Sequence, residues 1–75
     1  MSSVADCEKF LAYGDKEWDR VTADLVDGAP ITQEQVEIAC WLTGKTIREL
    51  EEEEFFYHPH ILKTEINKHR YRDAY

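Results

Sequence analysis

Apolar residues along much of this chain recur at intervals of three and four positions, which is the spacing of one face of an α-helix. Glycine, proline and polar residues separate the periodic stretches. No stretch shows the strict alternation of apolar and polar residues that is typical of a half-buried β-strand. The pattern therefore predicts an all-α fold, a small bundle of about four to five short helices.

Two helices are expected in residues 1–30. Ser3 can cap the first helix and Gly14 can end it in a left-handed conformation, while Asp15 can cap the second. Gly28 and Pro30 then end the second helix. The side chains expected to face the core are Val4, Cys7, Phe10, Leu11, Trp18, Val21, Thr22, Leu25 and Val26. Those expected to face away are Asp19, Arg20, Asp24 and Asp27.

The strongest local signal opens the second half of the chain. Thr32 and Gln35 have the spacing of a capping box, and Ile31 and Val36 occupy the two positions of a hydrophobic staple. A helix is therefore expected from this point to Gly44, which suits a left-handed end.

A second capping box, Thr46 with Glu49, predicts another helix directly after a short turn at residues 44–46. Ile47 and Leu50 should face the core in this helix. After the glutamates at positions 51–54 the helical periodicity stops, and three aromatic residues follow in a row. We expect a turn there, with the aromatic side chains closing one end of the core.

The last predicted helix starts at Pro59, which needs no amide partner in a first turn, with His58 at the cap position. The periodicity predicts an inward face and an outward, partly basic face. The inward residues are Ile61, Leu62, Ile66 and His69, and the outward residues are Lys63, Asn67 and Arg70.

The length of 75 residues predicts a single domain, with residues 1–30 as a helical hairpin and residues 31–75 as a helix-turn-helix-like core. A domain of this size buries a small core and has little stability to spare for a large ligand cavity. The sequence also lacks an arrangement of serine, histidine and acid that would indicate catalysis. We therefore expect a protein that is not an enzyme and that uses no cofactor.

Cysteine and histidine spacing does not match a metal site. Cys7 and Cys40 lie at apolar positions of helical patterns, so reduced, buried thiols are expected, with a disulfide or a redox role as the alternative. His58 and His60 flank a proline, and no Cys-x-x-Cys pair exists, so no zinc site is predicted. No basic-then-apolar opening segment and no long apolar stretch are present, which predicts a cytoplasmic protein without membrane attachment.

Charge is distributed unevenly along the chain, whose net charge is −7. Seven glutamates and two basic residues give residues 31–56 a net charge of −5, whereas four basic and two acidic residues give residues 57–75 a net charge of +2. An acidic protein repels phosphate backbones over long range and attracts basic proteins. Basic macromolecules are therefore the expected partners.

One tract combines acids with aromatic residues, a composition found at the centres of protein interfaces. Its members are Glu51, Glu52, Glu53, Glu54, Phe55, Phe56 and Tyr57. The tract predicts an acidic docking surface with aromatic anchors for a protein partner. The alternative is a charged helix end followed by aromatic residues of the core.

The region from Ile31 to Arg72 resembles the helix-turn-helix domain of insertion-sequence transposases and site-specific recombinases. The likeness is carried by Ile31 and Thr32, Ile38 and Ala39, Leu42, the Gly-Lys-Thr-Ile-Arg-Glu-Leu run at 44–50, and Ile61 with Glu65 and Ile66. It implies a core of three helices whose last helix, residues 59–71, enters the major groove of DNA. By this resemblance Lys63, Asn67 and Arg70 would contact bases or backbone.

Two functions therefore stay open. The first is a non-catalytic acidic protein that binds a basic nucleic-acid-binding protein or enzyme and modulates or inhibits it. Small acidic proteins of phages and mobile elements that act this way have a similar size and charge. The alternative is a helix-turn-helix transcription regulator that binds DNA as a homodimer, because one short helix contacts too few bases for specificity. A structural or assembly role is a third option.

Overall fold

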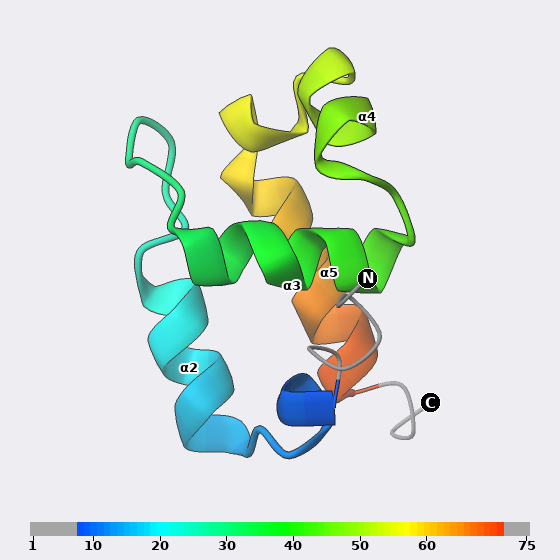
Figure 1. Cartoon of the computed structure of the whole chain (residues 1–75). Helices are drawn as coiled ribbons and strands as arrows, with labels where there is room; N and C mark the ends of the chain where they lie inside the picture. Colours follow the sequence, from blue (N-terminus) through cyan, green and yellow to red (C-terminus); the bar gives the residue numbers. More distant parts are fainter. Residues whose placement is uncertain (1–7, 72–75) are drawn as a thin grey trace.

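The computed structural model describes residues 8–71. Its elements are α2 (Asp15–Ala23), α3 (Gln33–Thr43), α4 (Ile47–Glu52), the 3-10 helix η1 (Phe55–Tyr57) and α5 (Pro59–Arg70) (Figure 1). Residues 8–11 are also helical, and no strand occurs between residues 8 and 71. The predicted small all-α bundle is confirmed. The expected cap at Ser3 and the expected inward residues Val4 and Cys7 lie outside the described residues.

Helix α3 crosses the middle of the molecule, in front of α5 and below α4 in Figure 1. Both of its ends match the sequence prediction. The Thr32 hydroxyl accepts a hydrogen bond from the Gln35 amide at 3.1 Å, and the Gln35 side chain accepts one from the Thr32 amide at 2.9 Å. Gly44 ends the helix with a φ of 73°, a conformation that glycine adopts without a steric penalty.

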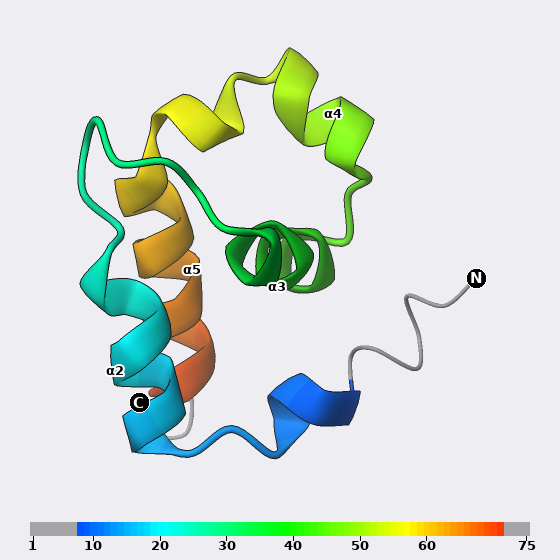
Figure 2. The same ribbon diagram turned by 60° about the vertical axis from the view of Figure 1, so that its left-hand side comes forward.

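Helices α2 and α5 run antiparallel and lie side by side in Figure 2. At the end of α5, Arg70 bonds to Asp15 and Asp19 of α2 at 3.3 and 3.0 Å. Near the start of α5, His60 lies 3.9 Å from Asp27, which follows α2. Residues at both ends of α5 therefore contact the α2 region. His58 occupies the N-cap position of α5 as predicted, without a capping hydrogen bond from its side chain.

The core draws on every described helix. Phe10, Ile38, Leu50, Leu62 and Ile66 are its largest fully buried side chains. An aromatic cluster joins residues 10–18 and the last turn of α5 to α3. Its members are Phe10, Tyr13, Trp18, Trp41 and His69, with the rings of Trp18 and Trp41 stacked at 6.4 Å and an interplanar angle of 7°.

Several predictions for the first half are wrong in detail. Gly14 has a φ of −97° and caps α2, so it is not left-handed and Asp15 is the first helical residue. Leu11 is 68% exposed, because the turn that follows residue 11 redirects the chain toward α2. Helix α2 ends at Ala23, so Leu25 reaches the core from the following turn while Val26 is exposed.

Two predictions for the second half are also wrong, for a related reason. Ile47 is 46% exposed, because α4 has only six residues and places only Leu50 in the core. The Ile61 side chain, which was expected to face inward, is 36% exposed, whereas Leu62 and Ile66 are fully buried as predicted. In both helices only part of the predicted apolar face meets the rest of the protein.

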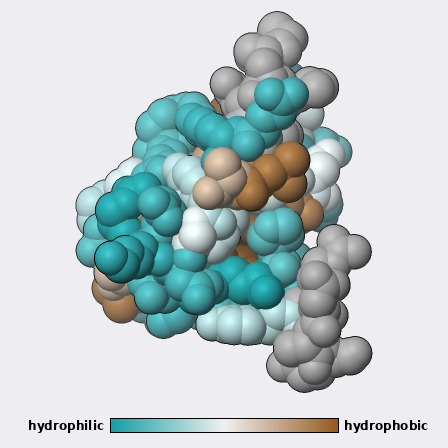
Figure 3. Space-filling view, turned by 90° about the horizontal axis from the view of Figure 1, so that it is seen from below, coloured by the Kyte–Doolittle hydropathy of each residue, from teal (hydrophilic) through white to brown (hydrophobic). Residues whose placement is uncertain are grey.

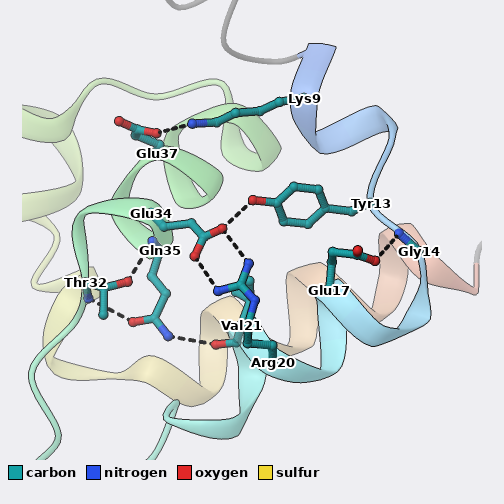
Figure 4. Close-up of polar contacts among 10 residues, drawn as sticks. All are labelled: Lys9, Tyr13, Gly14, Glu17, Arg20, Val21, Thr32, Glu34, Gln35 and Glu37. Carbon is teal, nitrogen blue, oxygen red and sulfur yellow. Dashed lines mark hydrogen bonds and ion pairs between the residues drawn. The ribbon is translucent and has the colours of Figure 1, made fainter.

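A polar network joins α3 to α2 and to Tyr13 in the segment that precedes α2 (Figure 4). Gln35 is 2% exposed, and its side-chain amide donates to the Val21 carbonyl at 2.7 Å. Glu34 accepts two hydrogen bonds of 2.9 Å from the Arg20 guanidinium and one from the Tyr13 hydroxyl. These bonds, from Arg20 first and then Tyr13, lower the pKa of Glu34 to about 2. Burial, followed by the contact with Glu34, raises the pKa of Tyr13.

Replacing Gln35 by Leu should destabilise the protein by about 1–3 kcal/mol, because the buried Val21 carbonyl and the Thr32 amide lose their partner. The control is Gln33→Leu, an exposed position on the same helix where a change within about 0.5 kcal/mol is expected. Chemical denaturation measures both. Equal effects at the two positions would contradict a structural role for Gln35.

The lowered pKa of Glu34 predicts a specific loss of stability in acid. The folded state favours the charged carboxylate, so this contribution is fully present above the usual pKa of 4.5 and is lost as the pH falls toward about 2. The free energy of unfolding should therefore fall less steeply over this range in Glu34→Gln than in the wild type. Glu8→Gln, at an exposed glutamate, is the control and should keep the wild-type slope.

Candidate protein-interaction surface

The predicted docking tract lies on α4, on η1 and on the turn between them, at the top of the molecule in Figure 1. All four glutamates are exposed, and Tyr57 is 77% exposed. Phe56 is half-buried against the core, and Phe55 is 7% exposed. The structure thus places Phe55 in the core, which removes it from the predicted contact surface and leaves Phe56 and Tyr57.

The backbone explains this division. Glu53 caps the C-terminus of α4, and Glu54 then adopts a left-handed conformation with a φ of 59°, which turns the chain. The Tyr57 amide donates to the Glu54 carbonyl at 3.1 Å, which forms η1 directly after the turn. Phe55 enters the core and meets Phe56 edge to face at 5.8 Å. Phe56 is thereby held in place while Tyr57 faces solvent.

Ion pairs divide the four glutamates into two kinds. Lys45 contacts both carboxylate oxygens of Glu53 at 2.8 Å, and Arg48 lies 3.8 Å from Glu52. Within residues 8–71, neither Glu51 nor Glu54 has a side-chain hydrogen bond or an ion pair. The negative charge at these two positions is therefore available to a partner.

The same two glutamates border a depression in the surface. Glu51, Glu54, Phe56 and Tyr57 line an open hollow of about 350 Å³. Two glutamates and two aromatic residues thus line one open depression, at the end of α4 and at η1. The hollow combines negative charge with apolar faces, a composition suited to a cationic group.

The residues predicted to contact DNA do not share one basic face. Lys63 and Asn67 of α5 are exposed as predicted. The Arg70 side chain is only 9% exposed and bonds to Asp15 and Asp19, so its predicted place on the outer face is wrong. Its Nε atom is buried without a hydrogen-bond partner, and its guanidinium lies 5.1 Å from the Tyr71 ring. The antiparallel packing of α2 and α5 turns Arg70 inward.

Other basic side chains are also engaged by acids. Lys68 lies 3.5 Å from Glu65, and Lys45 and Arg48 pair with glutamates of the tract. Seen from below, the molecule is mainly hydrophilic, with hydrophobic atoms confined to small areas (Figure 3). Among residues 8–71, Lys16 and Lys63 are the exposed basic residues without an acidic partner, so the described part of the chain offers little unpaired positive charge to a phosphate backbone.

No metal or membrane site emerges from the part of the chain that the structure describes. No three histidine, cysteine, aspartate or glutamate side chains between residues 8 and 71 are grouped to hold a metal ion. No helix in this range is both long and apolar enough to span a membrane. Cys40 is a free, half-buried thiol whose pKa is raised by burial, and Cys7 lies outside the described residues.

Comparisons with known protein families, with characterised proteins and with solved structures found no match to this chain. The surface described above is therefore interpreted from its own residues.

Sequence reasoning missed the long-range ion pairs. Arg70 is separated from Asp15 and Asp19 by more than fifty positions, and no local pattern joins them. The pair of Arg48 and Glu52 did have a signal, since opposite charges four residues apart on a helix are neighbours. Lys45 precedes α4 and Glu53 follows it, and the fold of this segment brings their side chains to within 2.8 Å.

Replacing Arg70 by Ala should lower the free energy of unfolding by about 1–3 kcal/mol, because the buried stem and its contacts with α2 are lost. The control is Lys63→Ala, an exposed position on the same helix that should leave stability nearly unchanged. Thermal unfolding compares the two variants. If Arg70→Ala were as stable as the control, the contacts of Arg70 with α2 would make no contribution to stability.

Proposed function

We propose that this protein binds the basic surface of another protein, of the kind that nucleic-acid-binding proteins and enzymes present, and inhibits it by covering that surface. The observation that supports the proposal is the hollow between α4 and η1, with the unpaired carboxylates of Glu51 and Glu54 beside Phe56 and Tyr57. The cytoplasmic location predicted from the sequence is compatible with such a partner.

Charge would govern the encounter. A net charge of −7 attracts a cationic protein, and an acidic surface accelerates association by electrostatic steering. Exposed charges alone add little affinity, since each remains hydrated. The aromatic side chains would supply the apolar contact, as aromatic residues do at the centres of many interfaces. Tyr57 is suited to this role because most of its surface is available in the unbound protein.

DNA binding by α5 has weaker support. A DNA-binding protein gains much of its affinity by neutralising phosphates with lysine and arginine. On α5 only Lys63 combines exposure with the absence of an ion pair among the described residues, because Lys68 and Arg70 contact acids. The exposed, unpaired carboxylates of Glu51 and Glu54 would add repulsion of phosphates. We therefore favour a protein partner.

A competition experiment tests the proposed function. Protamine, an arginine-rich polypeptide, is bound to fluorescent duplex DNA, and the wild-type protein should release the DNA in a salt-dependent way. The double variant Glu51→Gln with Glu54→Gln should release less, because it loses the two unpaired charges. The charge-matched control is Glu52→Gln with Glu53→Gln, which should retain more activity because those carboxylates already pair internally.

Two outcomes would contradict this proposal. Failure of the wild type to release DNA even at low ionic strength would exclude competition for a basic surface. Direct binding of the free duplex by the protein, reduced by Lys63→Ala and Asn67→Ala, would favour the DNA-binding alternative instead. Arg70 is left unchanged in that test because its loss is expected to destabilise the fold.

A further inference from the structure

We infer that the hollow between α4 and η1 receives one arginine side chain of the partner protein. The inference rests on the proposed function and deepens it by naming the chemical group that is recognised. The hollow is lined by Glu51, Glu54, Phe56 and Tyr57. The acids alone would attract any cation, whereas the aromatic residues that line the same hollow favour a planar one.

The pattern of ion pairs shows which carboxylates can serve this role. Glu52 and Glu53 face Arg48 and Lys45, which neutralise them from within the chain. Glu51 and Glu54 are three positions apart, border the hollow, and have no cationic partner among residues 8–71. The unpaired negative charge of the tract is thus concentrated at the hollow. A cation of the partner would neutralise Glu51 and Glu54, as Arg48 and Lys45 neutralise Glu52 and Glu53.

The rings decide between arginine and lysine. A guanidinium is planar, is weakly hydrated, stacks on aromatic faces and donates two parallel hydrogen bonds to a carboxylate. An ammonium is a compact, strongly hydrated charge that gains less from a flat aromatic wall. Phe56 is half-buried and held by its edge contact with Phe55, so one wall exists before binding. Tyr57 also lines the hollow, and its exposed ring is available for a second contact with the guanidinium.

The open form of the site suits a side chain that projects from a partner surface. The hollow is open, has a volume of about 350 Å³ and is built by consecutive turns of a short segment. It is not enclosed by several helices, as a pocket for a free small molecule commonly is. A side chain that projects from a partner surface can enter it while the surrounding exposed carboxylates contact neighbouring basic residues.

The test uses three short peptides that differ at one central position, which is arginine, lysine or the uncharged arginine isostere citrulline. Each is titrated into the isotopically labelled full chain, and backbone amide shifts are followed by NMR. The arginine peptide should shift the amides of Glu51, Glu54, Phe56 and Tyr57 in a saturable way. It should bind about three- to fivefold more tightly than the lysine peptide, the gain expected of an exposed cation–π contact. The citrulline peptide should not bind.

Two variants assign the effect to the hollow. Tyr57→Leu removes the exposed ring and should weaken the preference for arginine over lysine, while Phe56 and the two carboxylates leave residual binding of both peptides. Ile47→Ala, at an exposed apolar residue of α4 that does not line the hollow, should keep the preference. Because both side chains are exposed, the folded spectrum should be preserved in each variant.

The outcomes separate this inference from the proposed function. Equal affinity for the arginine and lysine peptides, with shifts at the hollow, would overturn the inference and leave a basic partner supported. Shifts confined to other parts of the chain would overturn the inference as well. Absence of binding by every peptide, together with failure of the wild type to release DNA from protamine, would overturn both.

Discussion

The buried face of α3 must be covered on several sides, because Ile38 and Ala39 have no exposed surface at all. Helices α5 and α4 both pack against α3, and they contribute Leu62, Ile66 and Leu50 to the same core cluster. Trp41 of α3 also packs against Trp18 of α2 and against Phe10 in residues 8–11. These two segments therefore cover α3 as well. The positions of the other helices follow from this one constraint, since removing apolar surface from water is the dominant favourable contribution to folding.

Polar contacts refine an arrangement that apolar burial establishes. Gln35 satisfies a carbonyl of α2 from inside the core, and Glu34 holds Arg20 and Tyr13 at the edge of the same junction (Figure 4). Arg70 joins the far end of α5 to the start of α2. Internal pairing of this kind uses most basic groups of the described helices. Among the described residues few cations are unpaired, whereas the unpaired Glu51 and Glu54 lie beside the half-buried Phe56 and the exposed Tyr57. Such a surface is complementary in charge to a cationic one.

The candidate surface was only partly predictable. The run of acids and aromatics identified the segment, because charge beside aromatic residues is visible in the sequence itself. The separation of Phe55 from Phe56 and Tyr57 was not predictable, because three adjacent aromatic residues have no period that distinguishes inside from outside. It depends on the left-handed turn at Glu54, a conformation that the sequence does not indicate at a glutamate. The prediction that Arg70 lies on the outer face of α5 was wrong because helical periodicity does not identify the neighbouring helix.

The sequence by itself determined the helices and most of their ends. Capping boxes at Thr32 and Thr46, the glycine at position 44 and the proline at position 59 act through atoms only a few residues apart, so their effect does not depend on the rest of the fold. Only the tertiary structure decided which faces of these helices are covered and which charges are left unpaired. Leu11 and Ile47 are exposed, and Glu51 and Glu54 have no ion-pair partner among residues 8–71, because burial and pairing depend on segments distant in the chain.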